Sequence, residues 1–204
     1  DGGGAGDDDN HDDMAIRSPR VRRAIAAAQD RGVVVTLATG RMFDFTLPAA
    51  KELGITAPLI CYQGGMIRYP DSDTPLYRAT MDPALVREVL EQRSEHGWHF
   101  VLYADGVVFL DERRQPDSFY RDMLGDRLIW VENLNAVLEQ QEPVKFLIFV
   151  EPHEAAGVES VLRQKFEGRI EIARSHALIV EGNPLGVSKG EALRRLAAYL
   201  DIPQ

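Results

Sequence analysis

The spacing of hydrophobic positions predicts a regular succession of helices and strands from residue 18 onward. Ser18 is a good N-cap, Pro19 suits the first helical position, and apolar residues then recur at helical spacing as far as Gly32. Residues 33–38 are continuously apolar and mostly β-branched, which predicts a strand buried on both faces. A helix over 42–53 and a second buried strand over 59–62 follow, and this order predicts a βαβ unit with parallel strands.

The second half of the chain has many short apolar runs separated by turn residues. A hairpin is expected over 67–69 and 76–78, and a helix from Asp82-Pro83 to Gly97. The tight turn Asp105-Gly106 predicts another hairpin. Ser188 and Glu191 form a capping box for a last amphipathic helix over 188–200. Between this second hairpin and the last helix we expect helices at 118–124, 134–140 and 153–166, and strands at 128–131, 145–150, 169–174 and 177–180.

These elements predict an α/β protein in which one domain is inserted into another. Residues 18–79 are the first part of a core domain, 80–182 an inserted α+β domain, and 183–204 the return segment of the core. Residues 1–17 are expected to be a disordered or altered acidic segment, because six aspartates and no lysine occur there beside many glycines. Without residues 1–16 the net charge is −3 instead of −9, so the folded part is only mildly acidic.

Composition argues against several classes of protein. The net charge of −9 disfavours nucleic acid as a partner, and the chain has no apolar run of eighteen residues that would span a membrane. Cys61 is the only cysteine and lies in an apolar run, which indicates a buried structural thiol and a reducing, cytoplasmic setting. The oligomeric state is open between a monomer and a homodimer.

Two turns can bind an anion. Thr39-Gly40-Arg41 lies where a predicted parallel strand ends and a helix begins, a place at which α/β sheets bind ligands and helix N–H groups favour phosphate. Lys189 lies in the first turn of the last helix, where the helix dipole disfavours a cation unless a phosphate or carboxylate compensates. A phosphate between Thr39 and Lys189 would meet a hydroxyl, backbone amides and an ammonium group, which suit phosphoryl transfer. An ordinary strand-to-helix turn and an exposed lysine are the alternatives.

The stretch 18–200 resembles the Cof-type phosphatases of the haloacid dehalogenase (HAD) superfamily. The resemblance is carried by four segments in the family's order and spacing, with a cap domain inserted between the third and the fourth: Ser18-Pro19-Arg20-Val21, Leu37-Ala38-Thr39-Gly40-Arg41, Ile60-Cys61-Tyr62-Gln63-Gly64-Gly65 and Gly186-Val187-Ser188-Lys189-Gly190-Glu191-Ala192-Leu193. It implies an incomplete Rossmann-like three-layer HAD core with an inserted α+β cap of the C2 type. It also implies a Mg²⁺-dependent phosphomonoesterase that acts on small phosphorylated metabolites, sugar phosphates among them, through an aspartyl-phosphate.

The resemblance also implies roles for individual residues. Thr39 and Lys189 would hold the phosphate, Lys189 also pairing with the nucleophile, while Gly40 contributes an amide and Arg41 lies near the substrate. Gln63 and Gly64 belong to the third segment, in which Gln63 stands where the family often has Asn. Asn183, in the return hinge 181–184, is a candidate substrate contact or simply a hinge residue.

The chain departs from the family pattern at both ends. The first 16 residues contain no apolar strand ending in Asp-x-Asp-Gly-Thr, although Asp1-Gly2 could be the remainder of that motif. In that case Asp1 is the second aspartate, a catalytic and metal-binding candidate; the alternative is that this segment is a tag. The family's acidic metal-binding motif would come after Gln204, so the other metal ligands are expected outside the chain. Two further readings are therefore open: a non-catalytic protein or inactive fragment that binds phosphate or a partner, and a phosphomutase.

Overall fold

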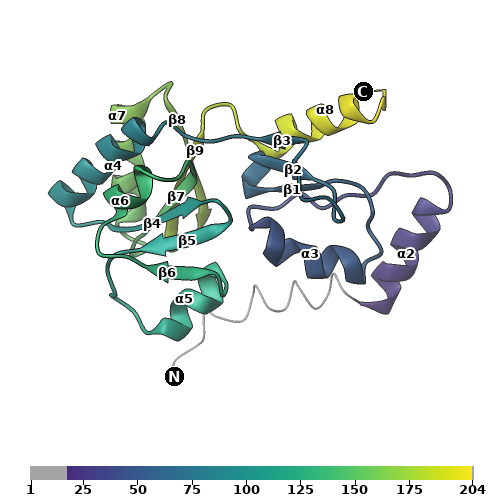
Figure 1. Ribbon diagram of the computed structural model, residues 1–204, viewed down its shortest axis with the longest axis horizontal. Helices are drawn as coiled ribbons and strands as arrows, with labels where there is room; N and C mark the ends of the chain where they lie inside the picture. The colour runs from purple at the N-terminus through teal and green to yellow at the C-terminus, as the bar shows by residue number, and fades with distance from the viewer. Residues whose placement is uncertain (1–17, 204) are drawn as a thin grey trace.

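The computed structural model describes residues 18–203 and places them in two sheets with flanking helices (Figure 1). Three short strands form the small sheet, in the order β1-β2-β3, and six form the large sheet, in the order β6-β5-β4-β7-β9-β8. The small sheet consists of β1 (Leu59–Cys61), β2 (Met66–Arg68) and β3 (Tyr77–Arg78). The large sheet consists of β4 (His99–Ala104), β5 (Val107–Leu110), β6 (Leu128–Trp130), β7 (Pro143–Phe149), β8 (Ile170–His176) and β9 (Ile179–Pro184).

The helices divide between the two sheets. Helices α2 (Pro19–Gln29) and α3 (Phe43–Glu52) precede the small sheet, and α8 (Lys189–Tyr199) lies on its other side. Helices α4 (Pro83–His96), α6 (Leu134–Leu138) and α7 (Ala155–Phe166) cover one face of the large sheet, and α5 (Asp117–Leu124) lies at its lower edge in Figure 1. No helix within residues 18–203 has both the length and the apolar character needed to cross a membrane.

The large sheet has a hydrophobic cluster on each face, because its central strands are buried on both sides. One cluster joins Phe100, Phe146 and Ile148 to α4, α6 and α7. The other joins Tyr103 and Leu147 to residues of α3, β1 and the turn after it, including Phe43, Leu59 and Tyr62. The second cluster therefore holds the large sheet against the region of the small sheet, and this contact brings the two halves of the candidate site together.

Several predicted elements are confirmed by the structure. The Asp105-Gly106 turn joins the antiparallel strands β4 and β5, and both turn residues have positive φ, at 49° and 74°. The expected hairpin over residues 67–78 forms as the antiparallel pair β2–β3. Ser188 caps α8 by accepting a hydrogen bond from the Glu191 amide at 3.1 Å. The thiol of Cys61 is buried, as expected.

The strand predicted over residues 33–38 is wrong in its extent and burial. Only Ala38 forms a bridge, with Ile60, and that bridge is parallel as expected. Val33 and Val34 are 53% and 47% exposed. Within residues 18–203, the segment 33–38 has a strand neighbour on one edge only, which is β1 at Ile60. The hydrophobicity of the segment alone therefore did not produce a hydrogen-bonded strand.

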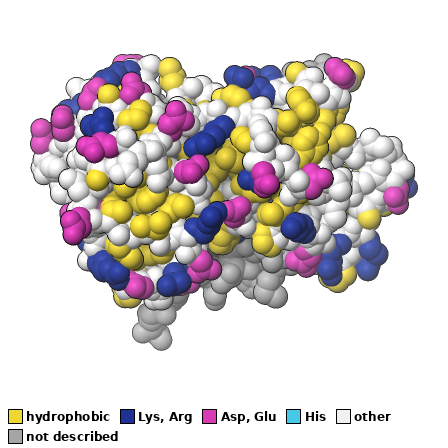
Figure 2. Space-filling model, in the orientation of Figure 1, with side chains coloured by type: hydrophobic (Ala, Val, Ile, Leu, Met, Phe, Trp, Pro, Cys, Tyr) yellow, Lys and Arg dark blue, Asp and Glu magenta, His cyan; other side chains and the backbone are white. Residues whose placement is uncertain are grey.

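The face of the molecule in Figure 2 carries lysine, arginine and acidic side chains intermixed, with hydrophobic patches over both halves. No basic stripe runs across this face. Its charge pattern is that of a mildly acidic protein rather than of a surface built for a polyanion.

Candidate functional site

The loop that contains Thr39 is tied to the end of β1. The Thr39 amide donates to the Ile60 carbonyl at 2.9 Å, and the Ile60 amide donates to the Leu37 carbonyl at 2.8 Å. The Thr39 hydroxyl oxygen accepts a hydrogen bond from the Arg41 amide at 3.2 Å. Because that contact uses the oxygen as an acceptor, the hydroxyl proton remains available for a ligand.

The turn after β1 has an uncommon backbone conformation. Tyr62 and Gln63 have φ of 52° and 58°, and Gly64 has φ of 106°. Two successive non-glycine residues with positive φ cost free energy and persist only where the surroundings impose them. Here the Tyr62 amide donates to the Arg41 carbonyl and the Gln63 amide to the Thr39 carbonyl, each at 3.0 Å. The turn is therefore attached directly to the Thr39 loop.

Two glycines show how closely the segments approach one another. A Cβ on Gly40 would lie 2.5 Å from Nε2 of Gln63, so the Gln63 side chain covers Gly40. A Cβ on Gly64 would collide with the carbonyl of Ser188, which caps α8. One turn, Tyr62–Gly64, therefore contacts both the Thr39 loop and the start of the helix that carries Lys189.

Lys189 is the first residue of α8, and its side chain is exposed. Its ammonium group forms no hydrogen bond or ion pair with residues 18–203. A cation at a helix start without a partner in this part of the chain can serve an anionic ligand. Arg41 lies at the other side of the Gln63 turn, with its guanidinium 4.8 Å from the centre of the Phe45 ring.

Two charged residues of the large sheet reach this site, and the sequence analysis missed them. Lys145 on β7 and Glu181 on β9 form an ion pair of 3.0 Å with side chains only 6% and 1% exposed. Glu181 also accepts a hydrogen bond from Nε2 of Gln63 at 2.8 Å, and Lys145 donates to the Gly40 carbonyl at 3.2 Å. The sequence signal was a single charged residue within each of two apolar strands, where an unpaired charge is costly.

Asn183 lies on the same strand as Glu181, two residues further on, so the two side chains point to the same face of the large sheet. Asn183 is 2% exposed, and its Oδ1 has no hydrogen-bond partner within residues 18–203. A buried amide oxygen without a donor costs free energy unless a ligand or water supplies one. The position of Asn183 therefore supports a role beyond that of a hinge.

Burial raises the pKa of three groups beside the site. It is the main cause of the raised pKa of Cys61, to about 12, so this thiol is protonated at neutral pH and is no nucleophile. Burial also raises the pKa of Tyr62 and of Tyr103 above the ordinary range for tyrosine. The neutral Tyr103 ring lies 5.0 Å from the Lys145 ammonium, close enough for a cation–π contact.

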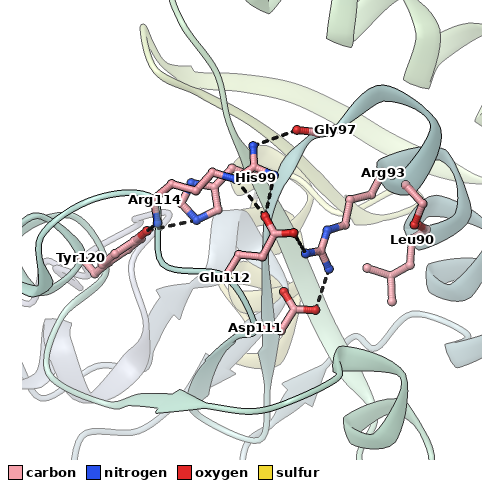
Figure 3. A network of polar contacts seen from close by, with 9 residues as sticks. Leu90, Arg93, Gly97, His99, Asp111, Glu112, Arg114 and Tyr120 are labelled. Carbon is pink, nitrogen blue, oxygen red and sulfur yellow. Dashed lines mark hydrogen bonds and ion pairs between the residues drawn. The ribbon is translucent and has the colours of Figure 1, made fainter.

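A second polar cluster lies where α4, the end of β5 and the start of α6 meet (Figure 3). Arg93 bridges Asp111 at 2.7 Å and Glu112 at 2.9 Å, and Arg114 donates to Glu112 at 2.8 Å. Burial alone would raise the pKa of Glu112, but the hydrogen bond from Arg114 and the charge of Arg93 lower it overall.

Two cavities, of about 380 and 400 Å³, border this cluster and share the residues Gly97, Trp98 and Arg114. Oδ1 of Asp111 is buried without a partner among the described residues. The other charges of the cluster satisfy one another, and a polar cavity of this kind readily holds water. The cluster is therefore best explained as part of the framework of the large sheet.

The described residues do not provide a metal site. Within residues 18–203 no group of three His, Cys, Asp or Glu side chains is arranged to hold a metal ion. Asp1, the expected catalytic and metal-binding residue, lies outside the described residues, as does the rest of the acidic segment. The described part of the site thus consists of hydrogen-bonding and charged groups that are gathered around one turn.

Comparison with known proteins places the chain in a family. Residues 10–204 match the model of the haloacid dehalogenase-like hydrolases. The chain is 26% identical over 193 residues to the HMP-PP phosphatase of Serratia proteamaculans, with 90% of this chain and 66% of the relative covered. The chain thus spans just under two thirds of the length of that curated relative.

Two solved structures have the same fold. A haloacid dehalogenase-like hydrolase from Bacteroides thetaiotaomicron superimposes with a TM-score of 0.78 at 22% identity, over 91% of this chain and 71% of the other. A protein from Thermotoga maritima superimposes with a TM-score of 0.76 at 24% identity, over 90% of this chain and 68% of the other. The family model covers nearly the whole chain, and the chain therefore belongs to the haloacid dehalogenase-like hydrolases, with their α/β fold and Rossmann-like core.

Proposed function

We propose that this protein is a Mg²⁺-dependent phosphatase of small phosphorylated metabolites, in which the Thr39 loop and the start of α8 bind the transferred phosphate. The observation that carries the proposal is the contact of the Tyr62–Gly64 turn with both segments. Two anion-binding elements that are 150 residues apart in sequence meet at one turn, an arrangement that a merely structural loop does not need.

Each group has a definite task in this proposal. The Thr39 hydroxyl and the Gly40 amide donate to phosphate oxygens, and the Lys189 ammonium offsets the negative charge of the phosphate during transfer. Arg41 lies at the rim of the same loop. Oδ1 of Asn183 accepts from a hydroxyl or amino group of the organic part of the substrate, because it is buried without a donor among residues 18–203.

Residues 80–182, which supply the large sheet except for the end of β9, are proposed to act as the inserted cap domain, which covers the site and selects the substrate. The hydrophobic cluster between Tyr103, Leu147 and the Tyr62 turn supports this role, since it excludes water from one side of the site. The relative from Serratia proteamaculans is an HMP-PP phosphatase, and a small phosphorylated substrate is proposed for this chain by that similarity.

The Mg²⁺ ion and the attacking carboxylate enter the proposal through the family alone. The covalent route through an aspartyl-phosphate needs an aspartate at the phosphate site. Asp1, if it belongs to the aspartate motif, is the second aspartate and not the attacking one, and it is outside the described residues.

The test is release of phosphate from p-nitrophenyl phosphate, with and without Mg²⁺. We expect Lys189→Ala and Thr39→Val each to lower kcat/KM by roughly a hundredfold, the effect of losing one preorganised donor. Lys51→Ala, an exposed lysine at the far end of α3, is the matched control and should leave the rate unchanged. Equal rates for Lys189→Ala and the control would reject the assignment of the site.

The absence of an acidic cluster within residues 18–203 favours one alternative, a protein that binds phosphate without hydrolysing it. Such a protein would bind inorganic phosphate in calorimetry, and Lys189→Ala would weaken that binding. It would release no phosphate from any ester, with or without Mg²⁺.

A further inference from the structure

Lys145 and Glu181 lie side by side on the face of the large sheet that packs against the small sheet. Tyr103 pairs with Lys145 across β4 and β7, and Leu147 pairs with Glu181 across β7 and β9. Alternation along the strands places all four side chains on the same face. That face joins the hydrophobic cluster that includes Tyr62, so the ion pair is enclosed between the two sheets.

Both charges are fully engaged in this enclosed position. Lys145 donates to Glu181 at 3.0 Å and to the Gly40 carbonyl at 3.2 Å, with the Tyr103 ring on a further side. Each carboxylate oxygen of Glu181 accepts one hydrogen bond, Oε1 from Gln63 and Oε2 from Lys145. A buried ion pair is weak evidence for stability, so its presence calls for another explanation.

The contact of Lys145 with the site passes through a single peptide group. The carbonyl of Gly40 and the amide of Arg41 belong to one rigid plane. Lys145 holds the oxygen end of this plane at 3.2 Å, and the Thr39 hydroxyl oxygen accepts from the nitrogen end at 3.2 Å. Orienting the plane therefore also orients the Thr39 hydroxyl.

The contact of Glu181 acts on the other side of the loop. The Glu181 carboxylate accepts a hydrogen bond from the Gln63 side-chain amide and holds that amide over Gly40. The approach is so close that a Cβ on Gly40 would lie 2.5 Å from Nε2 of Gln63. Gln63 belongs to the turn with positive φ at 52°, 58° and 106°, a conformation that needs support from its surroundings. Glu181 supplies part of that support from the large sheet.

We propose that Lys145 and Glu181 are positioning residues of the phosphate site, which orient the Thr39 hydroxyl through the Gly40–Arg41 peptide and hold the Gln63 turn in place. The inference rests on the proposed phosphatase function and adds a second part to it. The Thr39 loop reaches its working geometry only when the large sheet packs against the small sheet, because the side chains that orient the loop belong to the large sheet.

The experiment replaces the pair by apolar side chains of similar length, in Lys145→Met/Glu181→Met. Single variants leave one buried charge unpaired and can fail to fold, whereas the double variant leaves none. We expect the double variant to keep the urea midpoint close to that of the wild-type protein. We expect kcat and kcat/KM for p-nitrophenyl phosphate to fall together, by roughly ten- to a hundredfold, as for a misplaced catalytic geometry.

A second measurement does not depend on activity. The side-chain amide resonances of Gln63, assigned by their loss in Gln63→Met, should move in the double variant because the carboxylate acceptor is gone. Adding Gln63→Met to the double variant should lower kcat much less than it does in the wild-type protein, since the three residues act through one set of contacts. A purely structural role predicts additive losses instead.

The matched control is a largely buried pair beside the large sheet, Arg93 on α4 and Asp111 just after β5, whose side chains are 12% and 11% exposed. Arg93→Met/Asp111→Leu should leave kcat unchanged. A Lys145→Met/Glu181→Met variant with wild-type kcat, or with unmoved Gln63 resonances, would overturn the positioning role. A wild-type protein that releases no phosphate would instead overturn the proposed function, while the Gln63 resonances still report on the contact itself.

Discussion

The two sheets of this protein use their residues in opposite ways. The large sheet has six strands, paired in register except at Tyr103/Ala104 and Arg174/His176, and a hydrophobic cluster on each face. The small sheet has three strands of two or three residues each. The turn between its first two strands has positive φ, and neighbouring segments approach closely at Gly40 and Gly64. Long paired strands are rigid, and the proposed chemistry lies beside the short strands, because backbone donors are exposed only where a ladder stops.

The charged residues sharpen this comparison. The large sheet contributes Lys145 and Glu181 where it meets the small sheet, and their partners Gly40 and Gln63 are both in loops. Rigid strands can place a side chain accurately, whereas loops can present several backbone groups to one ligand. The site needs both properties.

The largest expected difference between the two regions concerns stability. Phe146 is fully buried and stacks on Phe100 at 5.0 Å, so Phe146→Ala should lower the free energy of unfolding by about 3–5 kcal/mol. Phe45 on α3 is 41% exposed, and Phe45→Ala should cost only about 1 kcal/mol. Urea unfolding measures both, and equal losses would mean that the two regions are equally well packed.

The next prediction concerns glycines of the two regions. Gly64→Ala should destabilise the protein by about 1–3 kcal/mol, because φ is 106° and the Ser188 carbonyl occupies the space for a Cβ. Its phosphate release should also be lost, since the turn joins both halves of the site. Gly157 lies within α7 with open space around it, and Gly157→Ala should stabilise by about 0.5–1 kcal/mol. Thermal unfolding that shows the same sign for both variants would contradict this reading.

A smaller effect is expected at Gly40, where the obstacle is a flexible side chain rather than backbone. Gly40→Ala should displace Gln63 and lower kcat by roughly tenfold, with little change in stability. In a Gln63→Ala background the clash is gone, so the added Gly40→Ala should have almost no effect. The measurement is the steady-state kcat of the wild-type protein, the two single variants and the double variant. If Gly40→Ala lowers kcat equally in both backgrounds, the clash with Gln63 is not the cause.

The smallest effect concerns pH and lies wholly within the region of the large sheet. Burial, with the nearby Arg114 charge, lowers the pKa of His99, which lies 3.2 Å from the Tyr120 hydroxyl. The unfolded chain therefore binds a proton more readily than the folded one. The free energy of unfolding should fall as the pH drops below the ordinary histidine pKa of about 6.5.

His99→Gln keeps a hydrogen-bonding group beside Tyr120 and should flatten this part of the stability profile. His153→Gln, at an exposed histidine, is the matched control. Urea midpoints between neutral and mildly acidic pH measure the effect. A wild-type protein that grows more stable as the pH falls would reverse the inferred sign.

The success of sequence analysis depended on whether an apolar run has neighbours in the fold. Hydrophobic spacing located the strands of the large sheet because each has a ladder partner and a face to bury, as at Tyr103 and Phe146. It failed at Val33 and Val34, which are apolar but exposed. An apolar run becomes a buried strand only when neighbours cover it, and neighbours are a property of the fold.

Candidate site residues could be named from sequence where local geometry marks them. Thr39 and Gly40 follow an apolar run, and Lys189 follows a capping serine, so each was visible within a few residues. Lys145 and Glu181 were missed because their meaning depends on contacts with Gly40 and Gln63, which are more than 100 residues away along the chain.

Local features could be inferred from the sequence alone: caps, turns, the periods of most helices and strands, and the family to which the four motifs belong. Two contacts became visible only in three dimensions: one turn with positive φ touches both the Thr39 loop and the start of α8, and a buried ion pair of the large sheet contacts Gly40 and Gln63. The physical reason is that local conformation follows from neighbours along the chain, whereas burial and charge pairing follow from neighbours in space.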